Sequence, residues 1–252
     1  MIRADLSLVE RGLCNSRTLA KSLITQNYVE KQSPQGWICL EKPSELIDDD
    51  TPLRILPNPI TKFVSRGGLK LDFAIREMGL EFQLKDLDAL DIGVSTGGFT
   101  HCLLTKGIAK AWGVDVGEGQ LSPMLKGDTR LNLFEKVNAR DLSAISHEFP
   151  ISGFDICAID VSFISIKLIL PEALKYLKSG GHLFALIKPQ FEVGPKHLNK
   201  KGVVVDKKIH SSLCQNLLAW LSDYKIRNIK WLKIPFVGGD GNQEYIVYAT
   251  KI

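Results

Sequence analysis

The stretch LDALDIGVSTGGFTHCLL, residues 87–104, holds the side chains and turns best suited to chemistry. An apolar run ends in Asp91, a turn with Gly93, Gly97 and Gly98 follows, and a second apolar run begins there. This order is typical of a strand, a glycine turn and a helix, which together bind nucleotide-like cofactors at the end of a parallel sheet. The glycines allow the backbone to approach a ligand closely.

Three kinds of cofactor site compete for this turn. A P-loop requires a lysine where this sequence has Phe99, and a dinucleotide fold requires Gly-x-Gly-x-x-Gly, which the turn lacks. S-adenosylmethionine has no phosphate, and Asp91 could lie near the ammonium group of its amino-acid tail. Asp115 ends the next apolar run, where an acid can bind both ribose hydroxyls of a dinucleotide or of S-adenosylmethionine. The remaining alternative is a turn that only joins a strand to a helix.

Composition and charge describe an ordinary folded protein with a mildly basic surface. The 252 residues are 44% hydrophobic and 24% charged, enough for one full core and a small second domain. The net charge of +4 is compatible with an anionic partner. Residues 1–60 carry seven basic and eight acidic side chains, so the basic excess lies in the rest of the chain.

The cysteines, the histidines and the apolar runs exclude several protein classes. The five cysteines form no C-x-x-C pair, which indicates free thiols in a reducing compartment. The histidines lack metal-ligand spacing, so we expect no metal. No signal peptide follows Met1 and no apolar run approaches 18 residues. We therefore expect a cytoplasmic protein without a membrane span.

The elements that position these residues alternate between strand and helix. Apolar runs predict parallel strands at residues 89–92, 111–115, 131–136, 154–159 and 182–187. Helices are expected to begin near Gly98, Leu121, Ile166 and Asp206. Two more strands, at residues 229–236 and 244–252, add a hairpin to the sheet. The pattern predicts a Rossmann-like, seven-stranded, doubly wound α/β fold.

A smaller α+β unit precedes this domain. Residues 3–30 predict two short amphipathic helices, the second capped by Ser16, and short extended runs follow. Two prolines within residues 56–60 indicate a linker. We therefore expect one domain at residues 1–58 and another at residues 59–252.

Seven motifs make the sequence resemble a known family. They are FVSRGGLKLDFA (63–74), DIGVSTGGFT (91–100), DVGEGQL (115–121), NARDL (138–142), IDVSFISIKLILP (159–171), IKPQFEVG (187–194) and GNQEYI (241–246). In this order they resemble the TlyA family over nearly the whole chain. That family joins an N-terminal alpha-L RNA-binding motif, here matched by LVERGLCNSRTLAKSLI, to an FtsJ-like methyltransferase domain. The resemblance implies S-adenosylmethionine-dependent 2′-O-methylation of cytidine ribose, with ribosomal RNA or ribosomal subunits as partner.

The resemblance also implies a catalytic set of Lys70, Asp160, Lys188 and Glu244. Methyl transfer from a sulfonium is an in-line displacement that needs an oriented hydroxyl and a base for its proton. Asp160 and Lys188 each follow an apolar run, which by itself places them at the carboxyl edge of the sheet. Burial and the like charge of Lys70 would favour the neutral amine of Lys188, and Asp160 would orient it.

Cofactor and RNA contacts follow from the same motifs and from the distribution of basic residues. The cofactor contacts we expect are Asp91, Gly93, Ser95, Thr96, Gly97, Gly98, Phe99, Asp115, Val116, Asn138, Ala139 and Asp160. The RNA phosphate contacts we expect are Arg3, Arg11, Arg17, Lys21, Arg66, Lys196, Lys200 and Lys201.

Other functions predict other features. Amino-methylation of bases predicts an Asn/Asp-Pro-Pro-aromatic motif where this chain has DVSF. Carbon-5 methylation needs a nucleophilic cysteine, and the nearby Cys157 lies inside a predicted strand, where a buried structural thiol is expected. Three alternatives from other classes remain: an RNA-binding protein without catalysis, a membrane-active haemolysin, as members of this family have been labelled, and an NAD-dependent enzyme.

Overall fold

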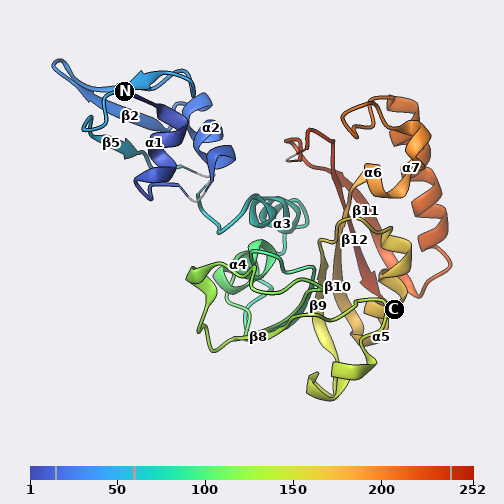
Figure 1. The fold of residues 1–252 in the computed structure, drawn as a ribbon. Coiled ribbons are helices and arrows are strands. Elements are labelled where there is room, and N and C mark those ends of the chain that lie inside the picture. Colours follow the sequence, from blue (N-terminus) through green and yellow to red (C-terminus); the bar gives the residue numbers. More distant parts are fainter. Residues whose placement is uncertain (15, 59–60, 239) are drawn as a thin grey trace. The chain divides into compact units, whose positions relative to one another are not determined.

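The computed structural model describes residues 1–14, 16–58, 61–238 and 240–252. Its contacts divide the chain into two compact units, Met1–Lys62 and Phe63–Ile252 (Figure 1). The predicted linker ends in residues 59–60, which lie outside the described residues.

A seven-stranded sheet forms the centre of the larger unit, as predicted. Its strands lie in the order β11-β12-β10-β9-β6-β7-β8. β12 is antiparallel to both of its neighbours, β10 and β11, whereas the other neighbouring strands are parallel. The strands are β6 (Asp88–Ile92), β7 (Lys110–Val114), β8 (Leu131–Phe134), β9 (Phe154–Ile159), β10 (Leu177–Ile187), β11 (Ile226–Lys233) and β12 (Tyr245–Lys251). The predicted hairpin is therefore the antiparallel pair β11–β12.

Helices cover both faces of this sheet, which makes it doubly wound as predicted. Figure 1 shows α3 (Arg66–Glu77) and α4 (Gly98–Thr105) on one side of the strands and α5 (Leu170–Tyr176) and α7 (Lys207–Leu221) on the other. Alternate residues of a strand point to opposite faces. In β9, Ile156 and Ala158 pack in the core of α3 and α4, whereas Cys157 and Ile159 pack in the core of α5 and α7. Burial raises the pKa of the Cys157 thiol, as expected for a structural cysteine.

Three of the four predicted helix starts are confirmed and one is wrong. Gly97, in the left-handed region at φ +92°, precedes α4, and Asp206 caps α7 by accepting a hydrogen bond from the Lys208 N–H. The helix expected near Leu121 is only a 3₁₀ turn at Pro123–Leu125, because the next residue, Lys126, has an extended backbone at φ −65° and ψ 123°. Near Ile166 a 3₁₀ turn precedes α5. Shorter elements are α6 (Pro189–Glu192) and 3₁₀ turns at Ser143–Glu148 and Pro195–His197.

Helix α3 was not predicted, because adjacent glycines in a helix interior normally disfavour the helix. The packing explains one of them. A Cβ on Gly68 would meet the Phe63 ring at 2.5 Å and the Gly98 carbonyl oxygen at 2.8 Å. The glycine therefore allows α3 to cross close to the start of α4, and this crossing brings the Lys70 turn to the sheet edge.

The smaller unit is α+β. Its elements are β1 (Ile2–Arg3), α1 (Ala4–Glu10), α2 (Arg17–Thr25), β2 (Val29–Ser33), β3 (Gly36–Cys39), β4 (Leu46–Ile47) and β5 (Leu53–Ile55). The antiparallel sheet β3-β2-β5 and the pair β1–β4 surround a core that includes Leu8, Leu23 and Val29. Ser16 caps α2, as predicted, since its hydroxyl accepts a hydrogen bond from the Leu19 N–H at 3.2 Å.

Candidate active site

Two adjoining cavities open at the carboxyl ends of the parallel strands in the larger unit. The strand order reverses at β6, which lies between β7 and β9, and ligands bind at such switch points. The larger cavity has a volume of about 530 Å³ and the smaller one about 290 Å³. Four residues line both: Gly93, Ser95, Asp160 and Ser162. A ligand in the larger cavity would therefore reach a second ligand in the smaller one beside Asp160.

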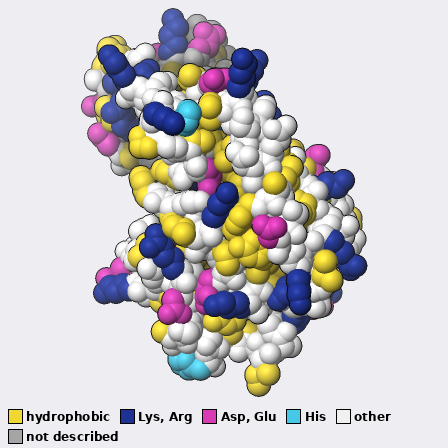
Figure 2. All heavy atoms as spheres, turned by 90° about the vertical axis from the view of Figure 1, so that its right-hand side faces the viewer, with side chains coloured by type: hydrophobic (Ala, Val, Ile, Leu, Met, Phe, Trp, Pro, Cys, Tyr) yellow, Lys and Arg dark blue, Asp and Glu magenta, His cyan; other side chains and the backbone are white. Residues whose placement is uncertain are grey.

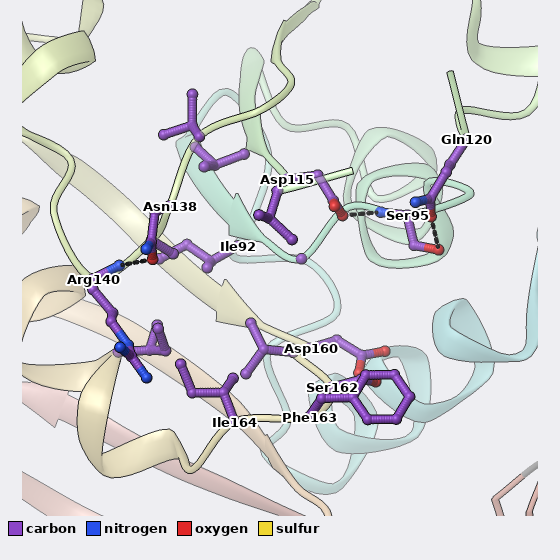
Figure 3. Close-up of a pocket in the computed structure, with 17 residues that line it drawn as sticks. Ile92, Ser95, Asp115, Gln120, Asn138, Arg140, Asp160, Ser162, Phe163 and Ile164 are labelled. Atoms are coloured by element: carbon purple, nitrogen blue, oxygen red, sulfur yellow. Dashed lines mark hydrogen bonds between the residues drawn. The ribbon is translucent and has the colours of Figure 1, made fainter. Parts of the chain in front are cut away.

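Most of the predicted cofactor contacts lie in the walls of these cavities. Gly93, Ser95, Asp115, Val116, Asn138, Ala139 and Asp160 line the larger cavity (Figure 3), and Thr96, Gly98 and Phe99 line the smaller one. Two predicted contacts, Asp91 and Gly97, are not among the described residues that line either cavity.

Asp115 is held in the wall of the larger cavity by backbone donors. Its Oδ2 accepts a hydrogen bond from the Ser95 N–H, and its Oδ1 accepts one from the Gly117 N–H, both at 2.7 Å. Figure 3 shows the first of these bonds, together with the bond from the Ser95 hydroxyl to Gln120. Each carboxylate oxygen can accept a second bond, so Asp115 can also bind ligand hydroxyls.

Asp91 is buried in β6, outside the residues that line the two cavities. Its side chain is fully buried in β6 and accepts a hydrogen bond from the Thr100 hydroxyl at 2.6 Å. Burial raises its pKa to about 7, and the carboxylates of Asp160 and Asp115 act in the same direction. The expected contact of Asp91 with an ammonium group stays a prediction, and in the structure the carboxyl joins β6 to α4.

Gly93 is required by both conformation and contact. Its φ of +89° lies in the left-handed region. A Cβ at this position would collide with the carbonyl oxygen of Asp160 and meet Val161 Cγ1 at 3.3 Å. The glycine thus allows the turn after β6 to lie directly against the end of β9.

The four predicted catalytic residues form two lysine–carboxylate pairs. Lys188 Nζ lies 2.7 Å from Asp160 Oδ1, and Lys70 Nζ lies 2.5 Å from Glu244 Oε2. All four side chains are at most 19% exposed, so water screens the pairs weakly. Lys70, Asp160 and Lys188 line the smaller cavity, and Glu244 lies behind Lys70. Elements distant in sequence therefore bring two lysine side chains to one cavity: α3, the ends of β9 and β10, and the start of β12.

Ser162 and Phe163 belong to the site but were not predicted. The Ser162 hydroxyl accepts a hydrogen bond from Lys188 Nζ at 2.7 Å, so Lys188 has two oxygen partners. Phe163 is 91% exposed, has a φ of +64°, and lies with its ring centroid 5.1 Å from that of Phe191. Figure 3 shows both residues on the segment that follows Asp160. The signal was the motif DVSF, whose serine and phenylalanine directly follow a strand-end acid.

The basic residues predicted for RNA in the larger unit line the smaller cavity or lie exposed on a loop. Arg66 lines the smaller cavity. Lys196, Lys200 and Lys201 are exposed on residues 194–206, here called the lysine-rich loop. Within the described parts of the chain, no carboxylate lies within 4.0 Å of these three lysines. Figure 2 shows lysine and arginine side chains scattered among acidic and hydrophobic side chains on the face it draws.

The arginines predicted for RNA in the smaller unit have internal partners. Arg3 and Arg17 both bond to the buried carboxylate of Asp5, at 3.0 and 3.1 Å. Arg11 donates to the carbonyl oxygen of Thr51 at 2.6 Å. Lys21 is exposed on α2. The three arginines therefore stabilise the unit itself, and only their remaining N–H groups are left for phosphates.

Two structural features bear on metal binding and on membrane spanning. Across residues 1–14, 16–58, 61–238 and 240–252, no three His, Cys, Asp or Glu side chains are grouped as metal ligands. No helix in these same ranges combines the length and the apolar character needed to cross a bilayer.

Comparison with known proteins identifies relatives over most of the chain. A family model described as FtsJ-like methyltransferase matches residues 63–251. The candidate rRNA methyltransferase YqxC of Bacillus subtilis (strain 168) is 40% identical over 248 residues, covering 98% of this chain and 84% of that protein. The 16S/23S rRNA (cytidine-2'-O)-methyltransferase TlyA of Mycobacterium tuberculosis is 32% identical over 247 residues, covering 98% and 88%. A solved structure of a candidate hemolysin from Streptococcus thermophilus, 36% identical, gives a TM-score of 0.74 and covers 99% of this chain and 88% of that one.

Proposed function

Since this chain belongs to the FtsJ-like methyltransferase family, we propose that it transfers a methyl group from S-adenosylmethionine to the ribose 2′-hydroxyl of a cytidine in ribosomal RNA. The family itself confirms the resemblance that the motifs predicted. The observation that carries the proposal is the pair of lysine–carboxylate contacts at the cavity beside Asp160. A set of this kind can orient a hydroxyl and remove its proton.

The larger cavity fits S-adenosylmethionine. Its volume of about 530 Å³ is within the range of small-molecule sites. Asp115 would bind the ribose hydroxyls, and the apolar and amide groups of Val116, Asn138 and Ala139 would surround the adenine. Gly93, which lines both cavities, would lie near the amino-acid tail.

The glycine turn argues against a dinucleotide, because it lacks the Gly-x-Gly-x-x-Gly pattern with which a backbone approaches a pyrophosphate.

The residues of the smaller cavity support the following chemistry. When bound, S-adenosylmethionine supplies an electrophilic methyl group on a sulfonium. Lys188 Nζ would accept the proton of the 2′-hydroxyl, while the ribose oxygen would form its bond to the methyl carbon and the bond from that carbon to sulfur would break, leaving a neutral thioether. Asp160 and Ser162 would orient the Lys188 amine towards the 2′-hydroxyl. The Lys70 ammonium, held by Glu244, donates a hydrogen bond that keeps the ribose oxygen in line.

RNA phosphates would be bound by four basic residues of the larger unit: Arg66, Lys196, Lys200 and Lys201. Residues 1–58 would act as the RNA-binding domain, with Lys21 as its exposed contact. We place this reaction in the cytoplasm, on ribosomal RNA or ribosomal subunits. The solved structure from Streptococcus thermophilus carries a hemolysin name. The residues that line the two cavities support methyl transfer and do not by themselves support a membrane activity.

The test is methyl transfer from radiolabelled S-adenosylmethionine to purified ribosomal subunits and to free rRNA, followed by nucleoside analysis. Label in 2′-O-methylcytidine supports the proposal. Label in a base would keep the cofactor but contradict the ribose chemistry. A protein that binds the cofactor but labels neither RNA would instead support an RNA-binding protein without catalysis.

A further inference from the structure

A buried asparagine joins the lysine-rich loop to the turn that carries Glu244. Asn242 is completely buried and lies two residues before Glu244. Its Oδ1 accepts a hydrogen bond from the Val204 N–H at 3.0 Å, and its Nδ2 donates to the Gly202 carbonyl oxygen at 3.1 Å. Its Nδ2 also donates to Asp240 Oδ2 at 3.1 Å. One side chain thus bonds both segments.

A second contact fastens the same point of the loop. The Val204 carbonyl oxygen lies 2.9 Å from His210 Nε2, and His210 Nδ1 lies 3.1 Å from the Tyr245 hydroxyl. The Tyr245 hydroxyl donates to Nδ1 when Nε2 carries the proton. The Asn242 side chain therefore holds the N–H of Val204, and the His210 ring, which contacts Tyr245, holds its carbonyl oxygen. Asn242 and Tyr245 lie on either side of Glu244 in the sequence. Val204 itself is 3% exposed.

The part of the loop that carries two of the lysines is a tight turn. Asn199 Oδ1 accepts hydrogen bonds from the N–H groups of Lys201 and Val203, at 2.8 and 3.0 Å. The Asn199 N–H donates to the Val203 carbonyl oxygen at 3.0 Å. Lys200 and Lys201 therefore move with residues 199–203, and Asn242 holds the end of this turn.

We infer that Asn242 is a positioning residue for RNA, which fixes Lys200 and Lys201 at a set distance from the Lys70–Glu244 pair. This inference rests on the proposed function, because RNA phosphates are the anions that the lysines would bind. Loss of the Asn242 amide would release the turn while leaving both cavities lined as before. RNA would then lose the phosphate contacts of the two lysines.

The test is the salt dependence of binding to purified ribosomal subunits, measured from 50 to 300 mM KCl, with methyl-transfer kinetics on the same subunits. Each phosphate contact contributes about 0.7–0.9 to the slope of log Kd against log salt concentration. Asn242→Ala should lower this slope by about 1–2 and raise KM for subunits roughly tenfold at the lowest salt concentration. The Kd for S-adenosylmethionine should remain unchanged.

A double-mutant cycle separates this role from general destabilisation. Lys200→Ala with Lys201→Ala should lower the slope as much as Asn242→Ala, and combining all three changes should lower it little further. The control is Asn228→Ala, which removes a 3.0 Å bond to Thr250 and strains a position at φ +55° in the same sheet. It should reduce stability and keep the slope.

Additive effects of Asn242→Ala and the lysine substitutions, or an unchanged slope in Asn242→Ala, would overturn the inference. If Asn242→Ala does not fold, His210→Ala releases the Val204 carbonyl from the other side and should lower the slope in the same way. A folded His210→Ala protein with the wild-type slope would then overturn it. Absence of methyl transfer by the wild type would instead refute the proposed function, since the slopes are read from binding alone.

Discussion

Lys188 Nζ and Asp160 Oδ1 lie 2.7 Å apart because their residues directly follow two neighbouring parallel strands. β9 and β10 pair in register up to Ile159 and Ala185, so both strands end at the same edge of the sheet. Asp160 also lines the two adjoining cavities. The relationship thus puts a lysine where a cofactor and a second substrate would meet.

Ser162 is expected to orient Lys188. Ser162→Ala removes one of the two oxygen partners of the amine, and we expect kcat to fall about tenfold, the scale of one lost charge-assisted hydrogen bond. KM for RNA and the Kd for S-adenosylmethionine should change little. Steady-state kinetics on ribosomal subunits check this, and Ser162→Thr, which keeps the hydroxyl, should recover most of kcat. Equal loss in both variants would argue against a role for the hydroxyl.

Glu244 is expected to hold Lys70 in the smaller cavity. Glu244→Gln leaves a nearly buried ammonium without its carboxylate, so kcat should fall by about 10- to 100-fold and the free energy of unfolding by about 3 kcal/mol. Kinetics and denaturant unfolding measure the two effects. Glu118→Gln is the matched control, because the pair of Glu118 with Lys136 is largely exposed and should contribute little. Wild-type kcat in Glu244→Gln would contradict the assignment.

Gly93 is expected to be indispensable for the cofactor site. Gly93→Ala adds a Cβ that collides with the Asp160 carbonyl oxygen and also strains a left-handed residue, so S-adenosylmethionine affinity should fall at least tenfold. Isothermal titration calorimetry checks this. Gly119→Ala has a similar positive φ with nothing within 4 Å of the new Cβ, and it should cost only about 1 kcal/mol of stability. Equal affinity losses in the two variants would refute the contact argument.

Asp91 is expected to make the free protein less stable as pH rises. Its pKa of about 7 lies above the value of about 3.9 in an unfolded chain. Between these values the folded state binds the extra proton, so stability is complete below about pH 4 and is lost as pH rises towards 7. Asp91→Asn lacks this titration and should gain on the order of 2 kcal/mol over the wild type between pH 5 and 8. Urea unfolding at several pH values tests this, and a gap that does not change with pH would contradict it.

Most of the fold could be predicted from the sequence because the strands are buried on both faces. Continuous apolar runs such as residues 154–159 mark them clearly, and the hairpin follows from the last two runs. Helix α3 was missed because its glycines serve a crossing with α4, which the local sequence does not reveal. The helix expected at Leu121 was wrong because the backbone becomes extended at Lys126, after a single 3₁₀ turn.

The site was predictable only where a residue follows a strand. Asp160 and Lys188 follow apolar runs, so the sheet edge itself brings them together. The contact between Lys70 and Glu244 joins a helix to a distant strand and came only from the family resemblance. The bonds of Asn242 depend on how two loops meet, which no local pattern encodes.

The most direct test of the account is single-turnover methyl transfer to ribosomal subunits by the wild type and by Lys188→Met, with the Kd for S-adenosylmethionine measured on both proteins. Methionine keeps the length and packing of the side chain but cannot accept the proton or pair with Asp160. The account predicts that the rate falls by at least 100-fold, the contribution of a general base, while the Kd stays within about threefold. A Lys188→Met protein that transfers the methyl group at the wild-type rate would contradict the account.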